Sequence, residues 1–234
     1  MKRSLPHSVC LCMLLATMVL SSPTMAEDEP STDVLSTITA TAKAVTASKS
    51  DDAVSMLEEM NKIRYIQASN RKKSAEALAS RLEAIIKNHP SPANKTVYAA
   101  VLSFLAKESG GLGGLSLAKK ARSILLEVTS SSDPGTLDGY AYIALGALYL
   151  RVPSWPIGFG DKKKAKEMID KALALNPKNI DANFYLASYY LAKKDKSLAR
   201  KALKEVLILP ARKSHAIGDE GRKQEAQKLM SSLA

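Results

Sequence analysis

The sequence predicts an all-α protein, and three observations carry that prediction. Apolar residues make up 46% of the 234 residues and aromatic residues only 5%, so the chain can bury a core of mainly aliphatic side chains. Apolar residues recur every three or four positions in several segments, as on one face of a helix. No segment alternates apolar and polar residues between turn residues, which is the pattern of a strand. Helices are therefore expected throughout.

Residues 1–26 have the three parts of a secretory signal. Basic residues stand near the start, residues 9–20 form an apolar run, and the segment ends in the small residue Ala26. A run of 12 residues is too short to cross a bilayer as a helix. We therefore expect a signal peptide that is cleaved after Ala26, and a mature chain that begins at Glu27 and is exported to a bacterial periplasm. A buried N-terminal helix is the alternative.

Cleavage would remove both cysteines, Cys10 and Cys12, together with two basic residues. The mature chain then has no thiol for a disulfide, a metal site or a nucleophile. Its formal net charge falls from +11 to +9, and residues 161–234 carry +8 of it, with 17 basic against 9 acidic residues. An acidic protein or peptide, or an anionic surface of the cell envelope, is therefore a candidate partner. Nucleic acid is not expected, because no aromatic residues interleave with the basic ones. No later apolar run has the length of a transmembrane segment.

Periodic apolar residues mark five helices in the first half of the chain. The expected ranges are 34–47, 52–68, 74–87, 96–107 and 117–128. Pro90, the glycines that begin at Gly110 and the turn at 130–135 separate the later helices. Residues 27–50 are expected to form an N-terminal segment whose order the sequence leaves open, with a loosely ordered helix as one alternative, and residues 51–234 are expected to form the folded helical domain.

Two stretches of the second half carry the same pattern of residues. The first has Tyr142, Leu145, Gly146, Tyr149, Ala165, Ile169, Ala172 and Pro177. The second has Leu186, Ala187, Tyr190, Ala199, Leu203 and Pro210. The two stretches repeat at 34 residues, apart from seven extra residues in a loop at 153–160 of the first stretch. Small residues in this pattern let paired helices approach closely, and a proline ends the second helix of each pair.

This pattern resembles the tetratricopeptide repeat, whose unit is a 34-residue helical hairpin. Aliphatic residues stand where the family has Phe on the second helix. The resemblance implies an α-solenoid of antiparallel helix hairpins, with the clearest repeats at 139–179 and 180–213. Weaker matches place further hairpins upstream. Residues 216–233 are expected to form a capping helix whose charged residues face solvent.

No set of residues suggests catalysis, a cofactor or a metal ion. His89 and His215, the two histidines beyond the signal, are isolated in the sequence, and two separate imidazoles make neither a metal site nor a catalytic triad. The glycines of 110–114 follow a helix and lack the Lys-Ser/Thr ending of a phosphate loop, so we expect a flexible connection there. Asp161 is expected to cap the helix that follows it.

The candidate residues for binding a partner or a ligand gather around the inserted loop. They are Tyr140, Arg151, Trp155, Phe159, Lys162, Lys163 and Lys164. Trp155 is the only tryptophan and lies between two prolines. It either folds back to fill the gap between hairpins, which is the interpretation we favour, or forms an exposed partner site. The three lysines form either a solvated helix face or part of a surface for an anionic partner.

The resemblance implies that the concave face of the array holds a protein or a peptide. An exported scaffold or adaptor is therefore the leading hypothesis. The first helices of the clear repeats lack the Lys and Asn of the family's dicarboxylate clamp, so acidic C-terminal peptides are not expected there. The alternative is a small-ligand-binding periplasmic accessory subunit of a solute transporter, with a ligand pore among the helices. An enzyme is the third hypothesis and the least favoured one, because the sequence shows no nucleophile, base or metal-binding set. The partner and the oligomeric state stay open.

Overall fold

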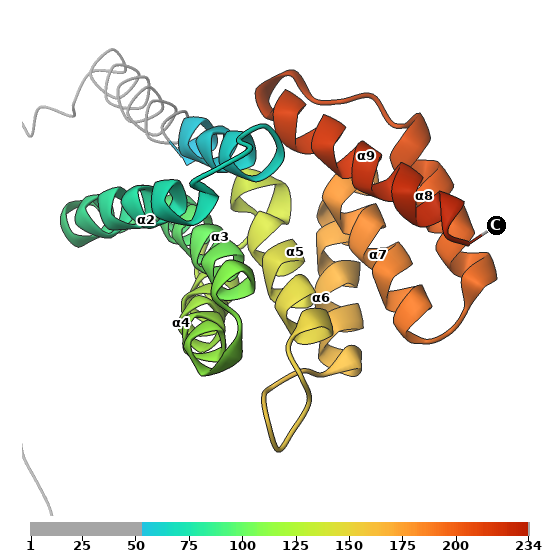
Figure 1. The fold of residues 1–234 in the computed structure, drawn as a ribbon, viewed down its shortest axis with the longest axis horizontal. Helices are drawn as coiled ribbons and strands as arrows, with labels where there is room; N and C mark the ends of the chain where they lie inside the picture. Colours follow the sequence, from blue (N-terminus) through green and yellow to red (C-terminus); the bar gives the residue numbers. More distant parts are fainter. Residues whose placement is uncertain (1–52, 234) are drawn as a thin grey trace, which may run out of the picture. The chain divides into compact units, whose positions relative to one another are not determined.

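The computed structural model describes residues 53–233, and all of the regular structure in that range is helical (Figure 1). The all-α prediction is therefore confirmed for this part of the chain. The expected signal peptide at 1–26 and the segment 27–50 lie outside the described residues.

The described chain begins with a helix at 53–65, which carries no label in the figures. The labelled elements are α2 (Arg71–Asn88), α3 (Pro92–Ser109), α4 (Gly111–Thr129), α5 (Thr136–Arg151), α6 (Lys162–Leu175), α7 (Ile180–Ala192), α8 (Lys196–Ile208), the short 3₁₀ helix η1 (Lys213–His215) and α9 (Ala216–Ser231).

Consecutive helices pair into hairpins, as the solenoid prediction requires. α3 packs on α4, α5 on α6 and α7 on α8, while α3, α5, α7 and α9 also contact one another in that order. Alternate helices therefore form one inner layer, and their hairpin partners lie outside it (Figure 1). This is the architecture of an α-solenoid.

Local sequence explains where the hairpins start. The side chain of Asp161 accepts hydrogen bonds from the backbone N–H groups of Lys163 and Lys164, which confirms the predicted cap of α6. Asn179 caps α7 and Asp195 caps α8 in the same way. These side chains satisfy N–H groups that have no partner within the helix.

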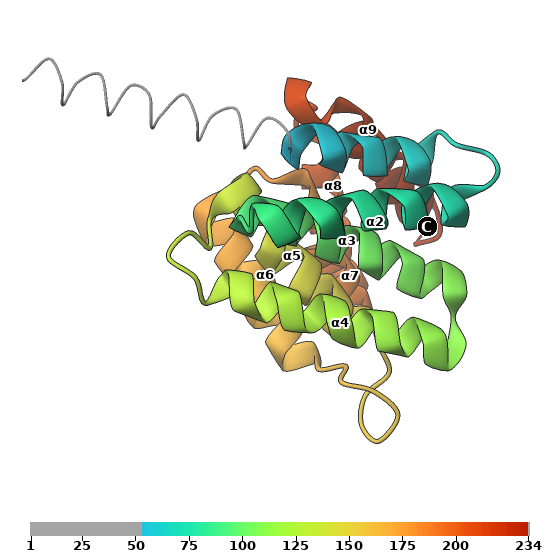
Figure 2. The same ribbon diagram turned by 90° about the vertical axis from the view of Figure 1, so that its left-hand side faces the viewer.

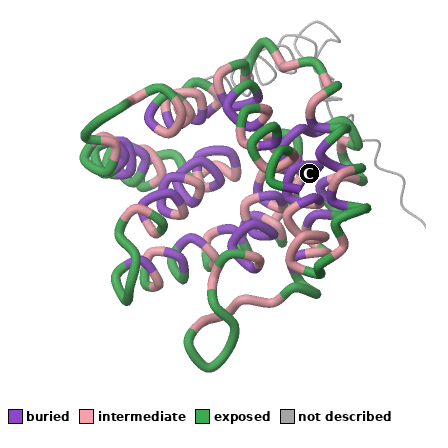
Figure 3. Tube along the Cα trace, turned by 45° about the vertical axis from the view of Figure 1, so that its right-hand side comes forward, coloured by how far each residue is buried: buried purple, intermediate pink, exposed green. Residues whose placement is uncertain are grey.

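The residues that define the repeat pattern form much of the core. Leu145, Ala165, Ile169, Ala172, Ala187, Ala199 and Leu203 have no exposed surface. Gly146 marks the closest approach of α5 to α6. A Cβ atom there would lie 3.0 Å from Cγ1 of Ile169 and 3.3 Å from the carbonyl oxygen of Ala165. Figure 3 shows the buried positions on the sides of the helices that face one another.

One expectation about the glycines at 110–114 is wrong. Gly111 to Gly114 form the first turn of α4 instead of a flexible connection. The reason is close packing, because a Cβ atom on Gly114 would lie 2.5 Å from the carbonyl oxygen of Ala106 in α3. The glycines therefore let α4 begin directly against the end of α3.

The two ends of the described chain contact each other. The helix at 53–65 lies alongside α9 (Figure 2). A Cβ atom on Gly221 would lie 2.4 Å from the ring of Tyr65, and one on Gly218 would lie 2.4 Å from the amide nitrogen of Asn61. The backbone N–H of Ile217 donates to the Glu58 carboxylate at 2.6 Å. The expected final helix is therefore present as α9, but its charged residues do not all face solvent, because Asp219 and Arg222 are buried.

Replacing Gly146 with leucine should overpack the α5–α6 hairpin and lower the free energy of unfolding by an amount on the order of 1–3 kcal/mol. Gly113→Leu is the matched control, because nothing lies within 4 Å of a Cβ atom at that helical position. Urea unfolding followed by circular dichroism compares the two. Equal stabilities for both variants would contradict the close approach at Gly146.

Candidate functional site

A cavity of about 580 Å³, open to solvent on one side, lies against the inner layer. The helix at 53–65, α3, α4, α5, α7 and the start of the inserted loop contribute to its wall. Most of the lining is apolar, and it includes Met60, Phe104, Leu115, Ile143, Ala147 and Leu148. Small-molecule sites in proteins are typically apolar clefts of about 300–1,000 Å³ with a few polar groups. The volume and the lining therefore match a site for a small ligand.

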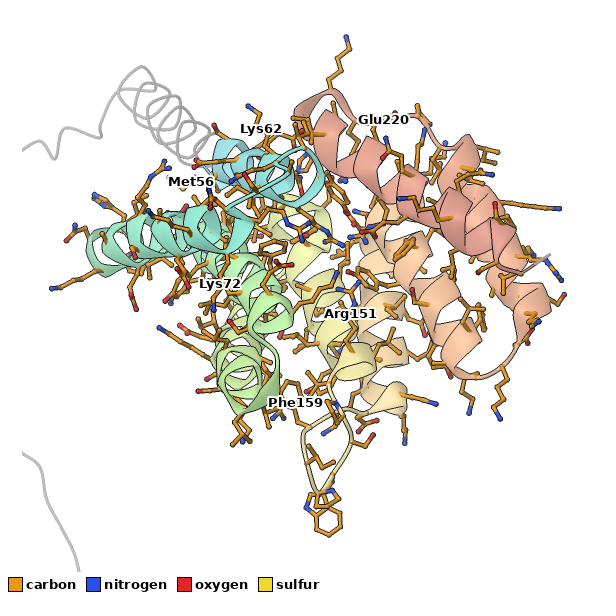
Figure 4. All side chains as sticks on the ribbon, viewed as in Figure 1. Met56, Lys62, Lys72, Arg151, Phe159 and Glu220 are labelled. Atoms are coloured by element: carbon orange, nitrogen blue, oxygen red, sulfur yellow. The ribbon has the colours of Figure 1, made fainter. Side chains whose placement is uncertain are left out.

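The polar groups of the cavity come from several helices. Arg64, Lys107, Tyr140, Arg151 and Tyr185 all line it. Figure 4 shows Arg151 between the ribbons of α5 and α7, and its guanidinium carbon lies 5.1 Å from the centre of the Tyr185 ring on α7. The cavity thus has cationic and hydroxyl groups on a largely apolar wall.

A network of ion pairs lies next to this cavity, and we call it the closing cluster. It consists of Arg64, Asp138, Asp181, Arg212, Asp219, Arg222 and Glu225. These residues come from the helix at 53–65, α5, α7, the segment before η1 and α9. The cluster therefore ties both ends of the array to its middle.

Arg222 is the centre of the closing cluster, and only 2% of it is exposed. Its Nε donates to the Asp181 carboxylate at 2.7 Å, and its Nη1 donates to Glu225. Glu225 also accepts a hydrogen bond from Arg64 at 3.0 Å. The guanidinium of Arg222 stacks on the rings of Phe184 and Tyr185. A buried guanidinium is costly without such partners, so these contacts are what make its burial tolerable.

The pKa values of the buried groups report the electrostatic environment. Burial raises the pKa of Tyr185, but Arg151, Arg222 and Arg64 together outweigh that effect and hold the pKa at about 8. Burial also raises the pKa of Asp181, and the positive charges of Arg222, Arg212 and Arg64 reverse this, so its pKa is below the usual value. Both shifts favour the negatively charged form, so the side of the cavity next to Tyr185 has a positive potential.

Arg151 differs from the other arginines in the described range. Each of the other seven arginine side chains donates a hydrogen bond to a protein acceptor; they are Arg64, Arg71, Arg81, Arg122, Arg200, Arg212 and Arg222. Within residues 53–233, the Arg151 guanidinium donates no hydrogen bond to a protein acceptor and has no carboxylate within 4 Å. It makes a cation–π contact with the Tyr185 ring.

The structure separates the sequence-predicted candidates into two groups. Tyr140 and Arg151 line the cavity, whereas Trp155 and Phe159 do not. Phe159 packs edge-on against Tyr149 instead, with ring centres 6.0 Å apart. The favoured interpretation that Trp155 fills a gap between hairpins is wrong, because 87% of its surface is exposed.

The three lysines lie away from the cavity. Lys162, Lys163 and Lys164 form the exposed first turn of α6, and the Lys162 amine donates to the carbonyl oxygen of Ala192. Two other basic residues of the C-terminal third, Arg212 and Arg222, belong to the closing cluster.

Sequence reasoning missed several residues of the site. Arg64, Tyr185 and Arg222 lie on helices that are far apart in the sequence, and none belongs to a motif. Arg222 stands among the charged residues of α9, and this composition is typical of a helix that faces solvent. The one available signal was the pair of glycines, Gly218 and Gly221, because glycine in the middle of a helix weakens it and often marks a close approach.

Comparison of the chain with protein-family models and with curated proteins finds no match. Within the range 53–233, no helix combines the length and apolar character that a membrane crossing requires. The same range contains no group of three His, Cys, Asp or Glu side chains placed to hold a metal ion. The cavity geometry is therefore the main guide to function.

Replacing Arg222 with methionine should lower the free energy of unfolding by about 3–5 kcal/mol, because Asp181 would stay buried without its main partner. Adding Asp181→Leu should recover a large part of that loss. Arg81→Met, which breaks an exposed pair with Glu59, is the control and should cost less than about 1 kcal/mol. Urea denaturation measures all three variants. A loss at Arg222 no larger than that at Arg81 would show that the closing cluster does not stabilise the fold.

Proposed function

We propose that this protein is an exported helical-repeat protein that binds a small ligand in the partly open cavity beside its inner layer. The observation that carries the proposal is the cavity itself. An apolar space of about 580 Å³ with a few arginine and tyrosine side chains on its wall has the size and composition of a small-molecule site.

The closed ends of the array favour a small ligand over an extended peptide. An open solenoid presents a long concave surface to a protein partner. Here the helix at 53–65 contributes Met60, Asn61 and Arg64 to the cavity wall, and the same helix contacts α9. The concave face is therefore partly covered, and the space that remains suits a compact molecule.

Export and the repeat resemblance support the same proposal. The predicted signal peptide places the mature chain outside the cytoplasm, and tetratricopeptide-like accessory subunits of solute transporters form ligand pores among their helices. A role beside a solute transporter is the cellular setting that we propose for the binding activity. The absence of a predicted nucleophile, base and metal set favours binding without catalysis.

Filling the cavity should abolish ligand binding without unfolding the protein. Nile red, a neutral dye whose fluorescence rises in apolar surroundings, is the probe. Ala144→Phe introduces a ring at a cavity-lining position, and Ala174→Phe introduces the same ring at an exposed position of α6. We expect Ala144→Phe to lose dye binding and Ala174→Phe to retain it, with the helical circular dichroism of both unchanged.

Two results would overturn the proposed function. One is a wild-type protein that does not bind Nile red. The other is equal dye binding by wild type and by Ala144→Phe, which would place the dye outside the cavity.

The exposed loop between α5 and α6 supports a second candidate function, that of an adaptor. Trp155 and Ile157 are 87% and 69% exposed, and Figure 3 shows this loop projecting from the helices. Exposed tryptophan side chains often become the central contacts of protein interfaces. The loop could therefore dock a protein partner while the cavity holds the ligand.

Trp155→Ala should leave the free energy of unfolding within about 0.5 kcal/mol of wild type, because the side chain is exposed. The fluorescence of wild-type protein, which comes from this single tryptophan, should be readily quenched by iodide and should become protected when a protein partner docks there. A large loss of stability in Trp155→Ala would instead restore the buried-plug interpretation.

A further inference from the structure

We infer that the ligand is an amphipathic carboxylate, whose acidic group is bound by Arg151 and whose apolar tail lies along the cavity wall. This inference rests on the proposed function and names the chemical class of the ligand.

Two cations of the cavity wall, Arg151 and Lys107, have no carboxylate within 4 Å in the range 53–233, and of these two Arg151 lies beside Tyr185. Its guanidinium lines the cavity, and no carboxylate lies within 4 Å of it in the range 53–233, whereas Arg64 and Arg222 beside the same cavity are paired with Glu225 and Asp181. A guanidinium presents paired N–H donors that match the two oxygens of a carboxylate. Arg151 therefore has donors available to an incoming anion on the side of the cavity next to Tyr185.

The position of Arg151 has a simpler structural explanation, which accounts for only part of what is observed. Arg151 lies in the last turn of α5, where a positive charge is favourable next to the helix C-terminus. Arg151 is also exposed, so water satisfies its donors when no ligand is bound. The helix terminus does not require the guanidinium to lie 5.1 Å from the Tyr185 ring of another helix, on the wall of the cavity.

The surroundings of Tyr185 show that the local field favours an anion. Arg151 and Arg222 both lie about 5 Å from its ring centre, and Asp181 is the main opposing charge, already paired with Arg222. The pKa of the Tyr185 hydroxyl is held at about 8 against the effect of burial. At pH 7 this hydroxyl is protonated and can donate a hydrogen bond, so it can serve as a second donor beside the guanidinium.

The rest of the wall indicates an apolar tail. Phe104, Leu115, Ile143 and Leu148 line the same cavity, and apolar surface buried against them contributes roughly 25 cal/mol per Å². A small hydrophilic acid would leave this wall in contact with water. A hydrocarbon chain or an aromatic group on the acid would cover it.

The test uses three probes that share one alkyl chain and differ in the head group: decanoate, decanol and decyltrimethylammonium. Isothermal titration calorimetry on the mature chain should give the tightest binding for decanoate. Arg151→Gln should weaken decanoate binding about tenfold or more, which is the usual effect of losing a charged hydrogen-bond partner. Decanol binding should be unchanged in Arg151→Gln, and Arg151→Lys should keep part of the preference for decanoate.

Two further measurements separate a direct role from a structural one. Lys119→Gln removes an exposed cation of α4 that is outside the cavity lining, and it should leave decanoate binding at the wild-type level. Arg151→Gln should raise the pKa of Tyr185, which absorbance of ionised tyrosine reports, while the helical circular dichroism stays the same.

The possible failures are distinguishable. If decanoate, decanol and the ammonium probe bind equally and Arg151→Gln changes none of them, the carboxylate inference is wrong while the cavity is still a ligand site. Preferred binding of the ammonium probe would also overturn the inference. If neither the alkyl probes nor Nile red bind, the proposed function itself fails.

Discussion

The contact between the helix at 53–65 and α9 is the constraint on which the rest of the structure depends. Helical repeats stack by local contacts, and nothing in a single hairpin requires the two ends of an array to meet. Here Gly218 and Gly221 remove the side chains that would separate the two helices. Because the two helices meet, the helix at 53–65 is held where Met60, Asn61 and Arg64 form part of the cavity wall.

The closing cluster explains why this arrangement is specific. Apolar contacts between two helices would tolerate several relative positions, whereas buried charges tolerate only those in which each has its partners. Arg222 reaches Asp181 on α7 and Glu225 on its own helix, and Glu225 also accepts from Arg64 of the helix at 53–65. A shift of α9 by one turn would leave these charges buried and unpaired, at a high cost in free energy.

The same small residues that allow close helix packing also leave the internal space. Ala100, Ala144 and Ala147 line the cavity on α3 and α5, where larger side chains would fill it. The charges around it are not distributed evenly. Carboxylates pair with Arg64, Arg212 and Arg222, so the field that remains on the cavity side of Tyr185 comes largely from Arg151. Small side chains therefore leave the cavity open, and the distribution of ion pairs leaves a positive potential on the side next to Tyr185.

The sequence by itself determined the helices, their pairing and the repeat. Capping residues such as Asp161 and the apolar stripe of each helix act over one or two turns, so they can be recognised without the fold. The spacing of Gly146, Ala165 and Ile169 likewise predicted a close hairpin that the structure confirms. Of the site residues, Tyr140 and Arg151 were among the candidates proposed from the sequence; Tyr140 lies on the first helix of the first clear repeat, and Arg151 lies just before the inserted loop.

Tertiary structure alone decided that the array closes and what the cavity contains. Arg64 and Glu225 are separated by 161 residues, and no local pattern links two residues across the seven helices α2 to α8. The burial of Arg222 could not be predicted, because the residues around it in α9 are those of a solvated surface. The exposure of Trp155 and the helical start of α4 at Gly111 were also decided by what packs against them. Local periodicity determines which residues form a helix, but only the assembled helices determine which charges lose their contact with water.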